Sequence, residues 1–174
     1  MCFEKICNDK LVPLKEEIPF DTYWISSILH DIGKMILGFF FWDHFQNVVT
    51  QMAEGRTDLA TFKEAEVEIG EAGRHERVGQ MLLMKSNVRK ELVEAVSSHH
   101  TVTENSSVLT ALLFFVNNLT KDLGLGYLPD EKGTYPDEVL AKLEIKKEDV
   151  DKIKETFTET MVPEIRNVVE LCLG

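Results

Sequence analysis

Ile28-Leu29-His30-Asp31-Ile32-Gly33-Lys34 is the most informative segment of this sequence. Apolar residues recur through it at helical spacing and predict a helix with one buried face, along whose flanks His30 and Asp31 lie side by side. These apolar positions are Ile25, Ile28, Leu29, Ile32 and Ile36. Imidazole and carboxylate groups both bind first-row metals, and Lys34 can reach an anion held at the same place. The alternative is a polar pair at a helix end that binds nothing.

Further polar residues recur where a metal site needs them. His75 lies on a glycine-flanked helix, with Gly79 one turn later, which favours a tightly packed inward histidine over a solvated one. A core histidine satisfied by hydrogen bonds is the alternative. His99 and His100 end a helical run, where the helix dipole explains one cationic side chain but not a doublet. Asn117 interrupts a hydrophobic helix, where a buried amide needs partners.

Together these motifs resemble the HD superfamily, and most closely its HDOD branch, the HD-related output domain of bacterial signalling proteins. A more distant resemblance is to the HD-GYP phosphodiesterases. The motifs that carry the resemblance are residues 29–34, residues 66–70 leading into His75 and Gly79, and residues 94–96 leading into His99 and His100. The resemblance covers roughly residues 23–125. Three linked motifs in the right order are much more specific than a lone His-Asp pair.

The resemblance implies a metal site. HD-superfamily hydrolases hold a divalent metal on their His-Asp pair and further ligands, and use it to hydrolyse a phosphate ester. The residues that match as metal ligands are His30, Asp31, His75, His99, His100 and Asn117. Lys34 matches the lysine that faces the substrate, a catalytic role that applies only if the protein is an enzyme. The expected cofactor is a divalent iron, manganese, nickel or zinc ion, or none.

Two members of the superfamily's ligand set are missing. No histidine precedes His30, and Asn117 stands where the last aspartate would fall. A neutral amide binds a metal more weakly than a carboxylate does, so both metal affinity and hydrolysis should suffer. We therefore favour an HDOD-like regulatory module in bacterial signal transduction that acts by protein contacts, and not an enzyme. The alternatives are a metal-dependent phosphohydrolase acting on a nucleotide or cyclic dinucleotide, and a structural hydrogen-bond network.

Composition limits the partners. The 174 residues carry 30 acidic and 19 basic side chains, a formal net charge of −11 that repels nucleic acid. Three scattered cysteines without a CxxC motif indicate a reduced, cytoplasmic chain. The longest apolar run, residues 108–116, is too short for a membrane span of about 20 residues. We expect no nucleic-acid or membrane partner, and a protein partner or a homodimer instead.

The pattern predicts an all-α, single-domain helical bundle of the HD-domain or HDOD type, with about seven or eight helices. Residues 1–20 are expected to form a leader and residues 21–174 the helical domain, in which the helices from about 136 are a subregion. The helix from Ser106 or Ser107 onward is apolar around most of its girth and should be central.

The aromatic run of residues 39–42 is expected in the core. Asp21 and Ser86 are expected to cap helices, and two more helices are expected over residues 43–54 and 61–69.

HDOD domains usually carry further helices before the His-Asp helix. Because only about twenty residues precede that helix here, we expect the aromatic run and the C-terminal helix to form an interface. The alternative is that residues 1–20 fold back and cover the apolar surface themselves.

Overall fold

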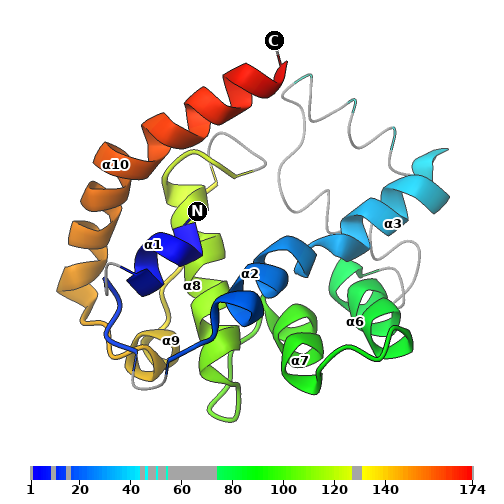
Figure 1. Ribbon diagram of the computed structural model, residues 1–174, viewed down its shortest axis with the longest axis horizontal. Coiled ribbons are helices and arrows are strands. Elements are labelled where there is room, and N and C mark those ends of the chain that lie inside the picture. The colour runs from blue at the N-terminus through cyan, green and yellow to red at the C-terminus, as the bar shows by residue number, and fades with distance from the viewer. Residues whose placement is uncertain are drawn as a thin grey trace.

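The computed structural model describes residues 2–8, 11–14, 17–43, 46, 50, 54, 74–126 and 131–173 (Figure 1). Every regular element in these ranges is an α-helix, which confirms the predicted all-α fold. The helices are α1 (Cys2–Asn8), α2 (Phe20–Leu29), α3 (Ile32–Phe40), α6 (His75–Lys85), α7 (Lys90–Ser98), α8 (Val108–Asp122), α9 (Asp137–Lys142) and α10 (Lys147–Leu173). Among the described residues, no helix combines the length and the apolar character that a membrane crossing requires.

The centre of the molecule is α8, as its apolar sequence predicts. Its side chains Leu112, Phe115 and Leu119 are fully buried. The helix begins after Ser107, whose side chain accepts a hydrogen bond from the backbone N–H of Thr110. In Figure 1 the long α10 arcs along one side of α8, while α2, α7 and α6 extend to the other side. Burial of this central helix holds the bundle together.

The leader packs on the bundle. Ile6 of α1 and Val12 are buried, and both belong to the same core as α8. Helix α1 contacts α2, so the segment before the His-Asp pair covers part of the apolar interior. The division into a leader of residues 1–20 and a domain of residues 21–174 stays a prediction.

The chain breaks between α2 and α3 at His30 and Asp31, and the predicted single apolar face through this stretch is wrong. Asp31 has φ −103° and ψ 13°, outside the helical values, so helical spacing cannot be counted across it. Ile28 is 55% exposed. The buried side chains of α2 are Thr22, Tyr23 and Ser26, of which two are small and let α2 lie close to α7 and α8.

Two glycines bring α3, α6 and α7 together. A β-carbon on Gly33 would lie 1.9 Å from the backbone carbonyl oxygen of His75, so only glycine allows this approach of α3 to α6. A β-carbon on Gly79 would lie 3.1 Å from the Val96 side chain and 3.7 Å from the Gly33 nitrogen. The tighter of the two approaches is therefore the one at Gly33, where the obstructing atoms belong to the backbone.

The aromatic run of residues 39–42 is exposed, and its predicted place in the core is wrong. Phe39 and Phe40 are 82% and 78% exposed. Both lie at the end of α3, where Figure 1 shows the helix extending away from the rest of the bundle. The run therefore contributes to the surface and not to packing.

Both predicted capping residues are also wrong. Helix α2 starts one residue before Asp21, which instead accepts a hydrogen bond from Arg89. Ser86 ends α6, and α7 begins only at Lys90. Helix α10 continues through Pro163 without splitting. The helix predicted over 61–69, and most of that over 43–54, lie outside the described residues.

Candidate metal centre

Four side chains from separate parts of the fold converge on one point. Asp31 lies between α2 and α3, His75 is the first residue of α6, and His99 and His100 follow α7. Each offers one ligand atom, and these four atoms all lie within 4.8 Å of one another. We call this group the Asp31 cluster. The structure thus brings together residues that are up to 69 positions apart in the sequence.

Four of the spacings between donor atoms lie near those between the ligands of a metal ion. The Nε2 atom of His75 lies 3.3 Å from that of His99 and 3.0 Å from that of His100. Oδ1 of Asp31 lies 3.4 Å from the Nε2 of His75 and 3.6 Å from the Nε2 of His99. A tetrahedral ion with bonds of about 2.0–2.1 Å places its ligands about 3.3–3.4 Å apart. Three imidazoles and one carboxylate are a donor set that suits zinc, iron or nickel.

The outer nitrogen of His99 fixes which ring nitrogen faces the cluster. Nδ1 of His99 lies 2.6 Å from the backbone carbonyl oxygen of Val96, which can only accept a hydrogen bond, so Nδ1 carries the proton. The lone pair of the neutral ring is then on Nε2, toward the cluster. Such an outer hydrogen bond to a carbonyl is what orients metal-binding histidines.

The two oxygens of Asp31 have different surroundings. Oδ2 accepts a hydrogen bond from Lys34 Nζ at 2.8 Å and lies 3.4 Å from Nε2 of His30. Oδ1 faces the histidines and is buried without a hydrogen-bond partner among the described residues. A buried oxygen left unpaired is costly, and a metal ion in the cluster would satisfy it.

The protonation states also suit metal binding. Burial opposes ionisation of Asp31, but His99, His30 and Lys34 hold the pKa of its carboxyl well below the usual range. Burial and the neighbouring His99 and His75 lower the pKa of His100 to about 2. At neutral pH the cluster therefore offers a carboxylate and a neutral imidazole, the forms in which these groups bind metals.

The remaining predicted site residues lie at different distances from the cluster. His30 lies beside the cluster, with its Nδ1 2.8 Å from the Ser27 carbonyl oxygen. Its Nε2 lies near Oδ2 of Asp31, the oxygen that does not face the other three histidines. Lys34 reaches the cluster through Asp31. Asn117 is half-buried in α8, where its backbone carbonyl oxygen accepts a hydrogen bond from the Thr120 hydroxyl. Metal ligation by His30 and Asn117 stays a prediction.

Two buried polar residues, one beside the cluster and one in α8, were not singled out by sequence reasoning. Glu76, next to His75, is buried and points one carboxylate oxygen at that histidine. Asn118, and not Asn117, is the buried amide of α8, and its Oδ1 accepts a hydrogen bond from the backbone N–H of Thr134. The position of Glu76 directly after His75 could have pointed to it. The role of Asn118 could not be predicted, because its partner Thr134 is 16 residues away in the sequence.

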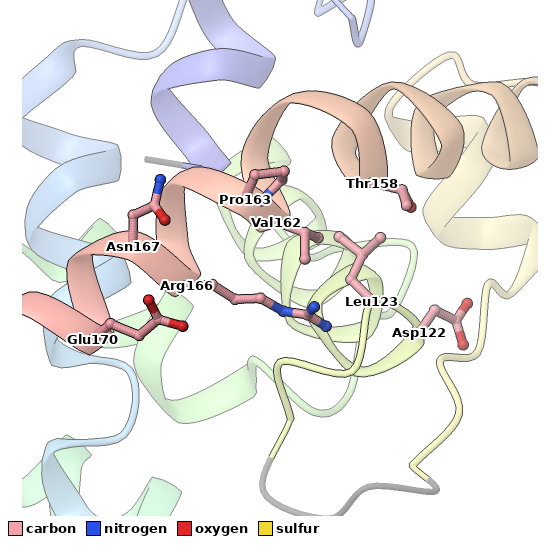
Figure 2. Close-up of a pocket in the computed structure, with 8 residues that line it drawn as sticks. All are labelled: Asp122, Leu123, Thr158, Val162, Pro163, Arg166, Asn167 and Glu170. Carbon is pink, nitrogen blue, oxygen red and sulfur yellow. The ribbon is translucent and has the colours of Figure 1, made fainter. Parts of the chain in front are cut away.

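A separate pocket of about 510 Å³ lies between the end of α8 and the C-terminal half of α10 (Figure 2). Arg166 extends across it toward Leu123, and Asp122 lies at its edge. Asp122 already pairs with Lys154 at 2.7 Å and accepts a hydrogen bond from Tyr135. The pocket shares no residue with the Asp31 cluster.

Comparison with known proteins identifies the family. Neither the comparison with curated proteins nor that with solved structures gave a match. The family model of the HDOD domain matches residues 6–102, which is more than half of the chain and includes all four members of the Asp31 cluster. The matched region starts at Ile6, inside the segment expected to be a leader. The chain belongs to the HDOD domain family.

Proposed function

We propose that this protein is a regulatory module of bacterial signal transduction that acts by protein contacts and carries a metal at the Asp31 cluster. The observation that carries this proposal is an exposed apolar stripe along α2 and α3. We call it the α2–α3 stripe, and its members are Phe20, Trp24, Ile28, Met35 and Phe39.

The α2–α3 stripe is unusual for a monomer surface. Within each helix its members recur every four residues, so Phe20, Trp24 and Ile28 share one side of α2, and Met35 and Phe39 share one side of α3. Single exposed apolar residues are normal, but contiguous apolar patches usually mark an interaction site. Phe20 stacks on Trp24, with ring centroids 6.3 Å apart, which gives the stripe a flat aromatic end. A surface of this kind fits another protein surface.

One member of the cluster, Asp31, lies between the two halves of the stripe. Asp31 lies between α2 and α3, so a metal that binds Asp31 also fixes the junction between the two halves of the stripe. Binding at one place can therefore alter affinity at the other, provided the metal favours one arrangement of α2 and α3. This linkage gives the metal a regulatory role that needs no hydrolysis.

The partner we propose is a second copy of the chain, because a twofold contact covers the stripe of both copies at once. Light scattering over a concentration series tests this, with wild type compared with Phe39→Lys. We expect a dimer that Phe39→Lys weakens. Met84→Lys is the matched control, since Met84 is 64% exposed but lies on α6 outside the stripe. A monomer at every concentration contradicts the homodimer.

Hydrolysis is not expected, because Asn117 stands where the resemblance to HD hydrolases places a carboxylate ligand, and a neutral amide binds a metal more weakly. We propose that cyclic dinucleotides and simple phosphodiesters are not turned over, with manganese or iron supplied. Turnover of about 1 per second, the low end for ordinary enzymes, that disappears in Asp31→Ala would overturn the proposal.

One observation favours the alternative, a metal-dependent phosphohydrolase acting on a nucleotide or cyclic dinucleotide. The ammonium group of Lys34 lies at the edge of the Asp31 cluster, 2.8 Å from Asp31 Oδ2, where it could hold a phosphate oxygen. A bound divalent ion supplies an activated water to such a reaction. Measuring nucleotide binding to wild type and Lys34→Ala tests this role separately from turnover.

A further inference from the structure

The pocket between α8 and α10 carries an unpaired positive charge. Its volume of about 510 Å³ lies in the range of about 300–1,000 Å³ that is usual for small-molecule sites. Leu123 and Val162 give it an apolar wall, and Arg166 extends across it (Figure 2). Among the described residues that line the pocket, Arg166 is the one positively charged side chain, and it makes no hydrogen bond or ion pair with the described part of the chain. The pocket therefore offers a guanidinium group to a ligand.

A negative charge lies in the same pocket. Glu170 is one helical turn after Arg166 on α10 and also lines the pocket. In the view of Figure 2 the Arg166 guanidinium points away from the Glu170 carboxylate, toward Leu123. Within the described ranges the side chain of Glu170, like that of Arg166, makes no hydrogen bond or ion pair. The pocket thus presents a cation and an anion that do not neutralise each other.

Asp122, at the edge of the pocket, is already used by the fold. Its Oδ2 pairs with Lys154 Nζ at 2.7 Å and accepts a hydrogen bond from the Tyr135 hydroxyl at 2.9 Å. Its Oδ1 accepts a hydrogen bond from the backbone N–H of Gly133 at 2.8 Å. These contacts tie the end of α8 to α10 and to the segment before α9. Asp122 therefore belongs to the wall of the pocket, and Glu170 is the carboxylate left for a ligand.

The charged groups define the chemistry of a ligand. The planar guanidinium of Arg166 matches a carboxylate, to which it can donate two parallel hydrogen bonds. A phosphate is disfavoured, because its second negative charge would lie close to Asp122 and Glu170. Glu170 suits an ammonium group instead. A ligand with one carboxylate, one ammonium group and an apolar body satisfies both charges and the apolar wall.

We propose that this pocket binds a small apolar α-amino acid as its zwitterion. The carboxylate pairs with Arg166, the ammonium group pairs with Glu170, and the side chain rests against Leu123 and Val162. The net charge of such a ligand is zero, so it is not repelled by a chain whose formal net charge is −11. The pocket lies outside residues 6–102 that the HDOD model matches, and it shares no residue with the Asp31 cluster. Loss of a metal from the cluster should therefore leave this second site intact.

NMR of the full chain measures the binding directly. The methyl signals of Leu123 and Val162 are followed while leucine, isoleucine, valine, methionine or phenylalanine is added to millimolar concentration. We expect at least one of these amino acids to shift both signals in a saturable manner, and to do so equally in protein stripped of metal with a chelator. If none of them shifts these signals, the pocket is not an amino-acid site.

Paired variants test the two charges. Arg166→Ala and Glu170→Gln should each weaken binding about tenfold, because each removes a charge-assisted contact. The matched controls are Arg77→Ala, on α6, and Glu164→Gln, which is exposed on α10 but is not among the described residues that line the pocket. Both controls should keep the wild-type affinity. Unchanged affinity in either pocket variant, or an equal loss in its control, contradicts the roles of Arg166 and Glu170.

Two analogues of the amino acid that binds separate a zwitterion from a simple anion. One analogue lacks only the amino group, and the other lacks only the carboxyl group. Each should bind the wild-type protein about tenfold more weakly than the amino acid does, because each loses one charge-assisted contact. An amine-free acid that binds as tightly as the amino acid overturns the zwitterion.

Discussion

Replacing Gly33 with alanine tests most sharply how α3 and α6 build the Asp31 cluster. A β-carbon on Gly33 would lie 1.9 Å from the carbonyl oxygen of His75 and 2.7 Å from its carbonyl carbon. Ordinary contact starts at 3.4 Å, so the two backbones must separate by about 1.5 Å. The obstructing atoms belong to the backbone, so no side chain can rotate away to make room.

The expected cost follows from this overlap. Forcing extra atoms into a packed interior costs about 1–3 kcal/mol, and sometimes more. Alanine returns about 0.5–1 kcal/mol through its better helix propensity. We expect Gly33→Ala to lower the free energy of unfolding by about 2 kcal/mol or more. Gly38→Ala on the same helix meets nothing within 4 Å and should raise it by about 0.5–1 kcal/mol.

Urea denaturation with linear extrapolation measures both changes, and Gly79→Ala should fall between them because its closest contact is the Val96 side chain at 3.1 Å. Zinc titration adds a second measure, since His75 must move with α6 and the zinc affinity of Gly33→Ala should fall. If Gly33→Ala were as stable as Gly38→Ala, the close approach of α3 to His75 would be refuted.

Three further predictions follow from the same structure. In protein stripped of metal, the free energy of unfolding should fall as the pH drops from about 7 to about 5, by at most about 1.4 kcal/mol per pH unit for each histidine. The reason is that burial lowers the pKa values of His30 and His100, so both take up protons mainly on unfolding; a flat profile in denaturation at several pH values contradicts this. Asn117→Asp should tighten zinc binding if residue 117 is a ligand, whereas lower thermal stability with no gain in affinity rejects that assignment. Asn118→Ala should cost about 1–3 kcal/mol in urea denaturation, because the N–H of Thr134 loses its acceptor, and a change near zero would show that this hydrogen bond is dispensable.

The sequence was sufficient for the parts of the fold that depend on local pattern. Helical periodicity without strand signals predicted the all-α class, and a helix apolar on nearly every side had to be the central α8. The grouping of Asp31 with His75, His99 and His100 was predicted from linked motifs, which carry long-range information that periodicity lacks.

Other features depend on contacts that no local pattern contains. The spacing of apolar residues predicted one continuous helical face through Asp31. That spacing alone does not show that the backbone leaves the helical conformation at Asp31. Aromatic character placed Phe39 in the core, although hydrophobicity does not tell which apolar residues find no partner within the chain. The approach of Gly33 to the backbone of His75 arises only when α3 and α6 meet.

The metal content of protein purified without added metal shows whether the Asp31 cluster holds a metal ion. Elemental analysis should find about one divalent transition-metal ion per folded chain of the wild type. The ion should be lost in Asp31→Ala, which removes the carboxylate whose buried oxygen faces the three histidines. Wild-type protein without a stoichiometric metal, or an Asp31→Ala variant that keeps the same metal content, would contradict a metal site at the Asp31 cluster.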